Sequence, residues 1–390
     1  MAIGGAERAL LGLLHSLDPE RVSVDLFLNQ HTGEFMPLIP KWVNVLPPVS
    51  VYTAIERPIK DIVREGHLMI AAARLWAKWQ CKRYQRSLTP EALAKDIGIF
   101  QFVADAVTPF LPSLEHLGEY DLAISFHFPH SITADKVSAK RKIAWIHTDY
   151  TAVNVHVERD LAVWRKFDHI VSISPDCTRA FLEVFPSLES KIIEIENLMP
   201  TALVRQQAEE GCAPELSQGE GVNLVSVGRI CYAKNYDNVP YIAAELRRLG
   251  LKFTWWIVGP GNHDDIDRVS ERLGVADCVR FIGSRTNPYP YIKACDIYVQ
   301  PSRFEGKSVT VREAQMLGKP VIITDYATAS SQVVDGIDGI IVPMDNEGCA
   351  RGIADAINNP NLLRKIADYT ATHDYGNESE VDKLYSLLNY

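Results

Sequence analysis

Several features that mark common protein classes are missing from this sequence of 390 residues. Its seven cysteines are scattered and no two form a CxxC pair, which argues against a zinc site and favours a reducing compartment. We find no signal peptide and no apolar run of about 18 residues, so neither secretion nor a transmembrane span is expected. The net charge of −9 argues against general nucleic-acid binding, which usually needs a basic face.

What is present is the composition of a globular protein, with 47% hydrophobic and 23% charged residues. Domains usually hold about 100–200 residues, so two domains are expected. Short apolar runs such as DLAISFHF, KIAWIHT and HIVSIS alternate with helical segments in the first half. A second series follows later with NLVSVGRI, FTWWIVGP, VRFIGS, IYVQPS and PVIITD. This alternation predicts two parallel α/β sheets, each covered by helices on both faces.

The expected boundary between the domains is the segment 201–220, TALVRQQAEEGCAPELSQGE, which is polar and lacks periodicity. The N-terminal domain then covers 1–200 and the C-terminal domain covers 221–375. Residues 376–390 have an amphipathic pattern, and we expect a helix there to pack on the N-terminal domain.

One segment differs from the acidic average, namely ARLWAKWQCKRYQR, in which Trp76 and Trp79 lie among cations and no acid occurs. A basic helix with tryptophans can lie on an anionic membrane surface. The alternative is a solvated helix whose aromatic residues pack on their own domain. The membrane interpretation predicts a cytoplasmic protein bound peripherally at the inner face of the plasma membrane. The cations are Arg74, Lys78, Lys82, Arg83 and Arg86.

The stretch PSRFEGKSVTVREA contains GKS, the last letters of a Walker phosphate loop. That interpretation fails because the residue five positions before Gly306 is Pro301, which has no backbone N–H. The stretch instead follows a predicted strand and begins a helix. The backbone N–H groups of Gly306, Lys307, Ser308 and Val309 would then point at a bound anion.

Other strand ends in the second half suit the same anion. VGRICYAKN places Arg229 and Lys234 after a strand, and two cations suit a diphosphate. IVGPGN adds a glycine turn at Gly259. Glu305 lies at the mouth of the predicted helix and Glu313 lies two turns into it, where carboxylates can accept hydrogen bonds from sugar hydroxyls. Each signal alone also fits a structural role, and the functional interpretation depends on their order together.

VGRICYAKN, IVGPG, FIGSRTNPYPYIKACDIYVQPSRFEGKSVTVREA and GKPVIITD resemble the C-terminal lobe of retaining glycosyltransferases of family 4, which have the GT-B fold. GGAERALLGLLHSL and KIAWIHTDY resemble the N-terminal lobe, and FEGKSVTVREA and WIHTDY look like bacterial capsular and exopolysaccharide glycosyltransferases. The likeness covers most of the chain outside 52–112. It implies two Rossmann-like parallel-sheet lobes facing a cleft, the first binding the acceptor and the second the nucleotide sugar. Only three residues precede Gly4, so we expect the family's first N-terminal strand to be missing.

The resemblance also implies roles for single residues. Arg229 and Lys234 would bind the donor diphosphate and stabilise the leaving group. Glu305 and His147 would lie at the donor sugar, and Glu313 would hold the ribose. The other donor-binding positions would be Gly4, Gly5, Gly259, Gly283, Ser284, Gly306, Lys307, Ser308 and Val309.

No metal and no cofactor is expected. Asp265 and Asp267 form an Asp-x-Asp pair, but they lie where a helix should start, which is an ordinary place for acids. His127 and His130 lack an evident third ligand. His147 ends an apolar strand and, without the family, fits a hydrogen-bonded structural histidine as well as a catalyst.

The resemblance therefore implies a retaining, metal-independent glycosyltransferase. It would move a sugar from a nucleotide sugar, in the first instance a UDP-sugar, to a lipid-linked saccharide acceptor in cell-surface polysaccharide synthesis. Two alternatives stay open. One is a nucleotide-sugar epimerase of the same fold, because fold does not fix function. The other is an inactive sugar-nucleotide-binding subunit that supports an active partner.

Overall fold

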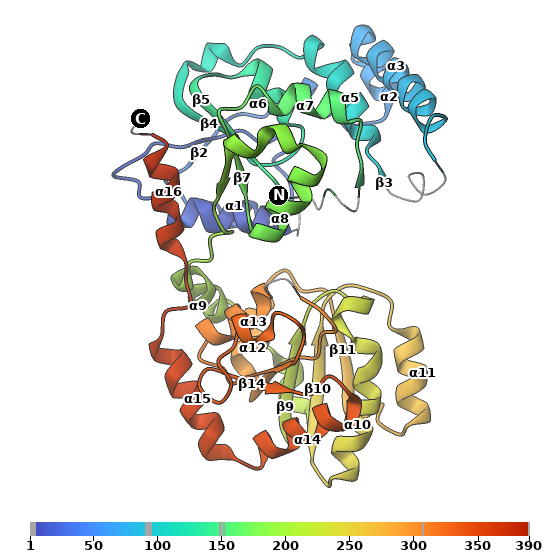
Figure 1. Ribbon diagram of the computed structural model, residues 1–390, viewed down its shortest axis with the longest axis vertical. Coiled ribbons are helices and arrows are strands. Elements are labelled where there is room, and N and C mark those ends of the chain that lie inside the picture. The colour runs from blue at the N-terminus through green and yellow to red at the C-terminus, as the bar shows by residue number, and fades with distance from the viewer. Residues whose placement is uncertain (1–4, 90–95, 148–149, 151–152, 306–307, 389–390) are drawn as a thin grey trace. The chain divides into compact units, whose positions relative to one another are not determined.

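The structure is a computed structural model that describes residues 5–89, 96–147, 150, 153–305 and 308–388. Its internal contacts divide the chain into two compact units (Figure 1). The first unit consists of Met1–Leu198 and Asn377–Tyr390, and the second of Met199–Gly376. Both units are built on parallel sheets, so the α/β prediction is confirmed.

The second unit has a six-stranded sheet in the order β11-β10-β9-β12-β13-β14. Its strands bury both faces, because Leu224 and Trp255 lie in one apolar cluster while their neighbours Val225 and Trp256 lie in another. A parallel sheet buried on both faces needs helices on both sides. In chain order the strands are β9 (Val222–Val227), β10 (Phe253–Val258), β11 (Val279–Gly283), β12 (Ile297–Gln300), β13 (Val321–Thr324) and β14 (Ile340–Val342).

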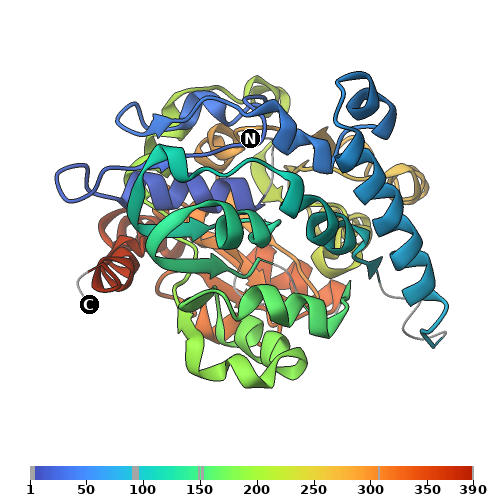
Figure 2. The same ribbon diagram turned by 90° about the horizontal axis from the view of Figure 1, so that it is seen from above.

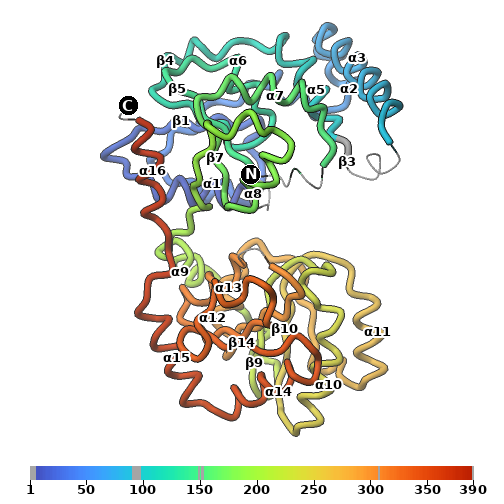
Figure 3. Tube along the Cα trace, viewed as in Figure 1, coloured from blue at the N-terminus to red at the C-terminus, as the bar shows by residue number. Residues whose placement is uncertain are grey.

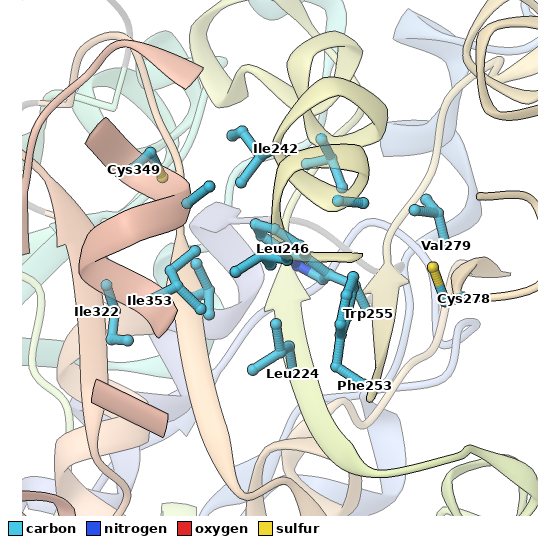
Figure 4. Close-up of a cluster of buried hydrophobic side chains, with 14 of the residues drawn as sticks. Leu224, Ile242, Leu246, Phe253, Trp255, Cys278, Val279, Ile322, Cys349 and Ile353 are labelled. Atoms are coloured by element: carbon cyan, nitrogen blue, oxygen red, sulfur yellow. The ribbon is translucent and has the colours of Figure 1, made fainter. Parts of the chain in front are cut away.

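Helices cover the two faces of this sheet in separate sets. Figure 4 shows the first face, where Ile242 and Leu246 of one helix and Ile353 of another lie around Leu224 and Trp255. This set is α10 (Val239–Arg248), α11 (Asp264–Arg272) and α14 (Asn346–Ile357). The opposite set is α9 (Thr201–Glu209), α12 (Tyr289–Ala294) and α13 (Val309–Met316). The remaining elements are α15 (Pro360–Thr372), η6 (Pro214–Gln218), η7 (Tyr232–Lys234), η8 (Tyr236–Asn238) and η9 (Ala329–Ser331).

The segment 201–220 is not the irregular connection that its polarity suggested. It forms α9 and η6, and Val204, Ala208 and Leu216 are buried in the core of the second unit. Arg205 also donates a hydrogen bond to the backbone carbonyl of Met316 in α13 at 3.0 Å. The apolar face of α9 is too short to show a helical periodicity in the sequence, yet its Val204 and Ala208 are buried in the core.

The first unit has a four-stranded parallel sheet in the order β4-β5-β7-β8. Trp145 and Val171 face one cluster with α1 and α16, and Ala144 and Ile170 face another with α7 and α8. The strands are β4 (Glu119–Ser125), β5 (Ser138–Trp145), β7 (His169–Ser172) and β8 (Ile192–Glu194). The helices are α1 (Gly5–Ser16), α6 (His130–Lys136), α7 (Val157–Trp164), α8 (Pro175–Val184) and, from the end of the chain, α16 (Val381–Ser386).

A second, two-stranded sheet in this unit pairs β1 (Asp25–Leu26) with β2 (Asn44–Val45). The Tyr120 hydroxyl of β4 donates to Asp25 Oδ2 at 2.7 Å, which links this sheet to the larger one. The strand expected to be missing before α1 falls on residues 1–4, which lie outside the described residues. A further pair joins β3 (Asp96–Ile97) to β6 (Val153–Asn154). Short 3-10 helices complete the unit: η1 (Met36–Leu38), η3 (Thr108–Phe110), η4 (Glu115–Leu117), η5 (Pro186–Lys191) and η10 (Glu378–Glu380).

A helical cluster with its own apolar core forms the rest of the first unit (Figures 2 and 3). It contains η2 (Ser50–Ile55), α2 (Ile59–Arg64), α3 (Leu68–Gln85) and α5 (Ile99–Val107). The basic segment of the sequence lies on α3. The expectation that Arg74 joins an exposed basic surface is wrong, because Arg74 is 9% exposed. Its guanidinium donates to the backbone carbonyls of Ala54 and Arg57, and burial lowers its pKa.

Candidate functional site

The loops after β9 and β10 meet at the carboxyl-terminal edge of the second sheet. Gly228 N–H donates to Val258 O at 2.9 Å, and Ile230 N–H donates to Pro260 O at 2.8 Å. Gly259 has a φ of 157°, and a Cβ atom there would lie 2.0 Å from the carbonyl oxygen of Gly228. Only glycine fits that distance, so the glycine turn seen in the sequence is required for the two loops to approach.

An ion pair joins the loop after β9 to the loop after β12. Lys234 Nζ lies 2.6 Å from Glu305 Oε1, and the side chains are 19% and 13% exposed. The 3-10 helix η7 carries Lys234, and Asn235 after it adopts a left-handed conformation with a φ of 60°. β9 is the sheet neighbour of β12, which is why residues 71 apart in sequence meet here. The ammonium has three N–H donors, so one can bind the carboxylate while the others face an anion.

A chain of buried side chains continues from this pair into the sheet. Ser302 Oγ donates to Glu305 Oε1 at 2.6 Å, and Gln300 Nε2 donates to Ser302 Oγ at 2.8 Å. The Tyr298 hydroxyl donates to Gln300 Oε1 at 2.7 Å. We did not predict Gln300 and Ser302 from the sequence. The available signal was two polar residues, Gln and Ser, closing an otherwise apolar strand in IYVQPS.

The second predicted cation, Arg229, follows Gly228 and is exposed. Among the residues that the structure describes, no hydrogen bond or ion pair holds its side chain. By contrast Arg303, which the sequence did not single out, is fixed by ion pairing with Asp237 at 2.6 Å and lies 4.2 Å from the ring centre of Tyr232. Arg229 is thus a cation at this edge that can move toward a ligand.

Helix α13 begins at Val309 with Ser308 as its N-cap, three residues later than the predicted start near Gly306, so Glu313 lies about one turn into the helix rather than two. The backbone N–H of Ser308 donates to Gln332 Oε1 at 3.0 Å, so this donor already has a partner within the protein. Gly306 and Lys307 lie outside the described residues. Glu313 is buried at 1% exposure, and the Tyr289 hydroxyl donates to its Oε1 at 2.7 Å.

The loop after β11 places two more of the predicted donor-binding residues at the same edge of the sheet. Gly283 ends the strand with a φ of 78°, and its carbonyl accepts a hydrogen bond from Gly259 N–H at 3.0 Å. Ser284 is exposed. Next to them Arg285 Nε donates to the Tyr291 hydroxyl at 3.0 Å. The carboxyl edge of β9, β10, β11 and β12 thus brings together most of the predicted donor-binding positions of the second unit.

His147 lies in the first unit, two residues after β5. Burial lowers the pKa of His147 to about 4, with a smaller contribution from His127, and a hydrogen bond with the backbone of Phe126 opposes that shift. The imidazole is therefore neutral at pH 7. Its Nε2 atom is buried and has no hydrogen-bond partner among the described residues. Gly5 begins α1 in the same unit, whereas Gly4 lies outside the described residues.

The remaining acids and histidines have structural partners. His130 Nδ1 lies 2.9 Å from Ser125 Oγ, and its ring packs 4.6 Å from that of Trp164. Asp265 pairs with Arg268, and Asp267 lies 2.7 Å from His263 Nδ1, both in the first turns of α11. Within the described ranges, no three or more His, Cys, Asp or Glu residues are grouped so that they could hold a metal ion.

The second unit matches a known family. Residues 221–359 match the model of the family described as glycosyl transferases group 1. The chain is 27% identical over 170 residues to the lipopolysaccharide core biosynthesis glycosyltransferase LpsE of Rhizobium meliloti, which is 42% of this chain and 49% of LpsE. It is 31% identical over 163 residues to D-inositol 3-phosphate glycosyltransferase 2 of Catenulispora acidiphila, which is 38% of each chain. The chain spans about half, or less, of the length of such curated relatives.

Solved structures resemble most or nearly all of the chain. HepE of Anabaena, in complex with UDP-glucose, has a TM-score of 0.58 and 15% identity over 99% of this chain and 94% of HepE. TarM of S. aureus, in a complex that includes UDP, has a TM-score of 0.53 and 17% identity over 75% of this chain and 59% of TarM. Likeness at these identities shows the fold alone, and that fold is GT-B. The chain thus has the GT-B fold, and its residues 221–359 match the glycosyl transferases group 1 family.

Proposed function

We propose that this chain is a glycosyltransferase that moves a sugar from a nucleotide sugar, in the first instance a UDP-sugar, to a saccharide acceptor. The observation that carries the proposal is the Lys234–Glu305 pair at the carboxyl edge of the second sheet. A cation suited to a diphosphate and a carboxylate suited to sugar hydroxyls lie side by side there. They would occupy the two sides of the sugar–phosphate bond that must break.

In this proposal, the donor diphosphate binds Lys234 and Arg229, which stabilise the negative charge as the leaving group departs. The bond between the anomeric carbon and the phosphate oxygen breaks, and the acceptor hydroxyl oxygen bonds to the same carbon. The hydroxyl proton passes to the departing phosphate. Attack on the face that the phosphate leaves gives retention, and these cations supply the charge stabilisation without a metal.

Glu313 and His147 would complete the donor site. Glu313 would accept hydrogen bonds from the ribose, and the buried carboxylate is held for this by Tyr289. His147 would contribute as a neutral group, because burial keeps its pKa near 4. A neutral imidazole can donate or accept a hydrogen bond at the donor sugar without adding charge.

The acceptor is proposed to be a lipid-linked saccharide in cell-surface polysaccharide synthesis, of capsule or exopolysaccharide type. Support comes from the relatives, since LpsE is named for lipopolysaccharide core biosynthesis. Another matched protein, EpsF of Bacillus subtilis, is named a putative glycosyltransferase and is 28% identical over 137 residues. A lipid-linked acceptor would bring the reaction to a membrane surface.

Helix α3 supplies a surface for that membrane. Leu75, Trp76 and Trp79 on its outer side are 58%, 54% and 49% exposed, and the two indoles stack at 4.7 Å. The end of the same face is basic, and Arg83 lies 5.6 Å from the ring centre of Trp79. Apolar aromatics beside cations suit an anionic lipid surface, which would hold the enzyme peripherally at the inner face of the plasma membrane. The cations of this face are Lys78, Lys82, Arg83 and Arg86. Throughout the described part of the chain, no helix has the length and apolar character needed to span a bilayer.

The test is a screen of UDP-, GDP- and dTDP-sugars in EDTA, scored by thermal stabilisation and by release of nucleoside diphosphate. We expect one nucleotide class to stabilise the protein and to release its diphosphate faster when a saccharide acceptor is added. Conversion of the donor sugar without an acceptor would point to an epimerase instead. Binding with no turnover would point to a supporting subunit, and binding of no nucleotide would overturn the proposal.

A further inference from the structure

The carboxylate of Glu305 is held on one side only. Three donors converge on its Oε1 atom: Lys234 Nζ at 2.6 Å, Ser302 Oγ at 2.6 Å and Gln300 Nε2 at 3.2 Å. To Oε2, by contrast, no hydrogen bond is found within the described ranges. A carboxylate oxygen with three donors is saturated, whereas the other oxygen keeps its capacity to accept.

The direction of each hydrogen bond behind Glu305 is fixed by its neighbours. Glu305 Oε1 can only accept, so the Gln300 amide atom that faces it at 3.2 Å must be the nitrogen, and Gln300 Oε1 then accepts from the Tyr298 hydroxyl at 2.7 Å and from Thr310 Oγ1 at 3.3 Å. Ser302 Oγ accepts from that nitrogen and therefore gives its own proton to the carboxylate. Both Gln300 and Ser302 are fully buried, so water does not compete for these donors.

These hydrogen-bonded side chains also connect the two loops that form the site. The Tyr298 hydroxyl lies 3.4 Å from the backbone nitrogen of Val227, the residue before Gly228 and Arg229. Lys234, from the same loop as Arg229, pairs with Glu305 at the other end of this series of hydrogen bonds. A buried and fully connected polar network of this kind holds side chains in one arrangement, because breaking any link leaves a buried donor or acceptor unpaired.

We propose that Ser302 and Gln300 are positioning residues that fix Glu305 with its Oε2 atom turned to the donor sugar. This inference rests on the proposed function, in which Glu305 accepts hydrogen bonds from that sugar. Neither residue touches the substrate. They hold the Glu305 carboxylate in the orientation that the sugar needs, so sugar binding does not have to restrict the rotation of this side chain.

A structural role makes a different prediction. Ser302 also anchors its loop through its backbone carbonyl, which accepts a hydrogen bond from Thr324 Oγ1 at 2.6 Å. If the Ser302 hydroxyl served only to hold the loop, its loss would disturb phosphate binding and stability together. If the hydroxyl positions Glu305, its loss disturbs only the binding and the turnover that involve the donor sugar. UDP, which has no donor sugar, separates these cases when it is compared with UDP-glucose.

The experiment compares Ser302→Ala with Ser226→Ala as the matched control. Ser226 is an equally buried serine on the neighbouring strand β9, and its hydroxyl donates to Val299 O at 2.5 Å rather than to Glu305. For the wild type and both variants, we would measure thermal stability, the affinities for UDP and UDP-glucose, and kcat and KM with the nucleotide sugar that the wild type cleaves. Gln300→Met, which removes the amide donor at similar volume, is the second variant.

We expect Ser302→Ala to lower kcat by about tenfold and to reduce the affinity gain of UDP-glucose over UDP. The UDP affinity and Tm of Ser302→Ala should stay close to those of Ser226→Ala. Gln300→Met should likewise keep its UDP affinity and Tm, and its kcat should fall less than that of Ser302→Ala. Parallel loss of UDP binding and stability, or turnover equal to that of the control, would overturn the inference. A wild type that binds no nucleotide would instead remove the proposed function, and this inference with it.

Discussion

The two units of this protein are built on the same kind of parallel sheet, but they expose different chemistry. In the second unit, the carboxyl edge of the sheet holds a partly buried ion pair between Lys234 and Glu305. At the corresponding edge of the first unit, the predicted site residue is His147, which burial keeps neutral. The charged chemistry is thus concentrated in the unit that matches a glycosyltransferase domain.

The two units also differ in what surrounds the sheet. The second unit packs apolar residues against both faces of its sheet. The first unit carries an added helical cluster, in which α3 leaves Leu75, Trp76 and Trp79 open to solvent. A repeated fold does not imply a repeated function, and we propose that the second unit binds a nucleotide sugar and the first a membrane surface.

The largest effect is expected for Glu305→Gln. This change keeps the size of the side chain but removes the negative charge that faces the donor sugar, and kcat should fall about 10²- to 10³-fold. Binding of UDP should change little, because the phosphates do not need the carboxylate. The readout is nucleoside diphosphate release, with Glu271→Gln, an exposed glutamate on α11, as the control. Turnover at the wild-type rate would remove Glu305 from the mechanism.

The corresponding test for the first unit is the variant with Lys82, Arg83 and Arg86 all changed to Gln. Each cation near an anionic lipid surface contributes about 1 kcal/mol, so partitioning to anionic vesicles should weaken by about 100-fold. Thermal stability should be unchanged, because the three side chains are exposed. Flotation with vesicles measures the binding. The control changes three other exposed cations, Lys41, Arg364 and Lys365, and equal release by both variants would contradict a specific surface on α3.

A smaller effect is expected from pH at His147. Its pKa lies near 4 in the folded protein, against an ordinary value of 6.5, so the unfolded chain binds the proton more tightly. The contribution of the neutral imidazole to the free energy of unfolding is therefore complete above pH 6.5 and is lost as the pH falls toward 4. After allowance for partial solvent exposure, the loss should be about 2 kcal/mol.

Urea unfolding of the wild type and His147→Gln at pH 7 and pH 4.5 measures this difference. The variant should lose less stability than the wild type over that range. Because His130 is present in both proteins and the charge on His147 is the smallest cause of the low pKa of His130, the titration of His130 largely cancels from the comparison. Identical pH dependence would mean that His147 is solvated in the folded state.

The sequence was enough to predict the fold, because each strand is a short buried apolar run and the runs alternate with helices. The sequence did not predict the burial of residues whose partners lie far away in the chain. Residues 201–220 look like a linker because α9 is short and mostly polar, yet Val204 and Ala208 complete the core of the second unit. Arg74 looks like its basic neighbours, but carbonyl groups contributed by Ala54 and Arg57 make its burial tolerable.

For the candidate site, several residues that the sequence singled out lie at one edge of the second sheet, but their partners could not be predicted. Lys234 and Glu305 were assigned to phosphate and sugar separately, and their contact depends on β9 lying next to β12. Ser308 was expected to offer its backbone N–H to a ligand, but Gln332, 24 residues later, accepts that hydrogen bond. Such pairings follow from strand order and loop path, which local patterns do not specify.

The most direct test of the central claim, that the charged edge of the second unit binds the nucleotide diphosphate, is a calorimetric titration of UDP in EDTA. It would compare the wild type with Lys234→Ala, and with Lys252→Ala as an exposed control in the same unit. We expect the wild type and Lys252→Ala to bind UDP equally and Lys234→Ala to bind about tenfold more weakly. Equal affinity in all three proteins, or no binding by the wild type, would contradict the claim.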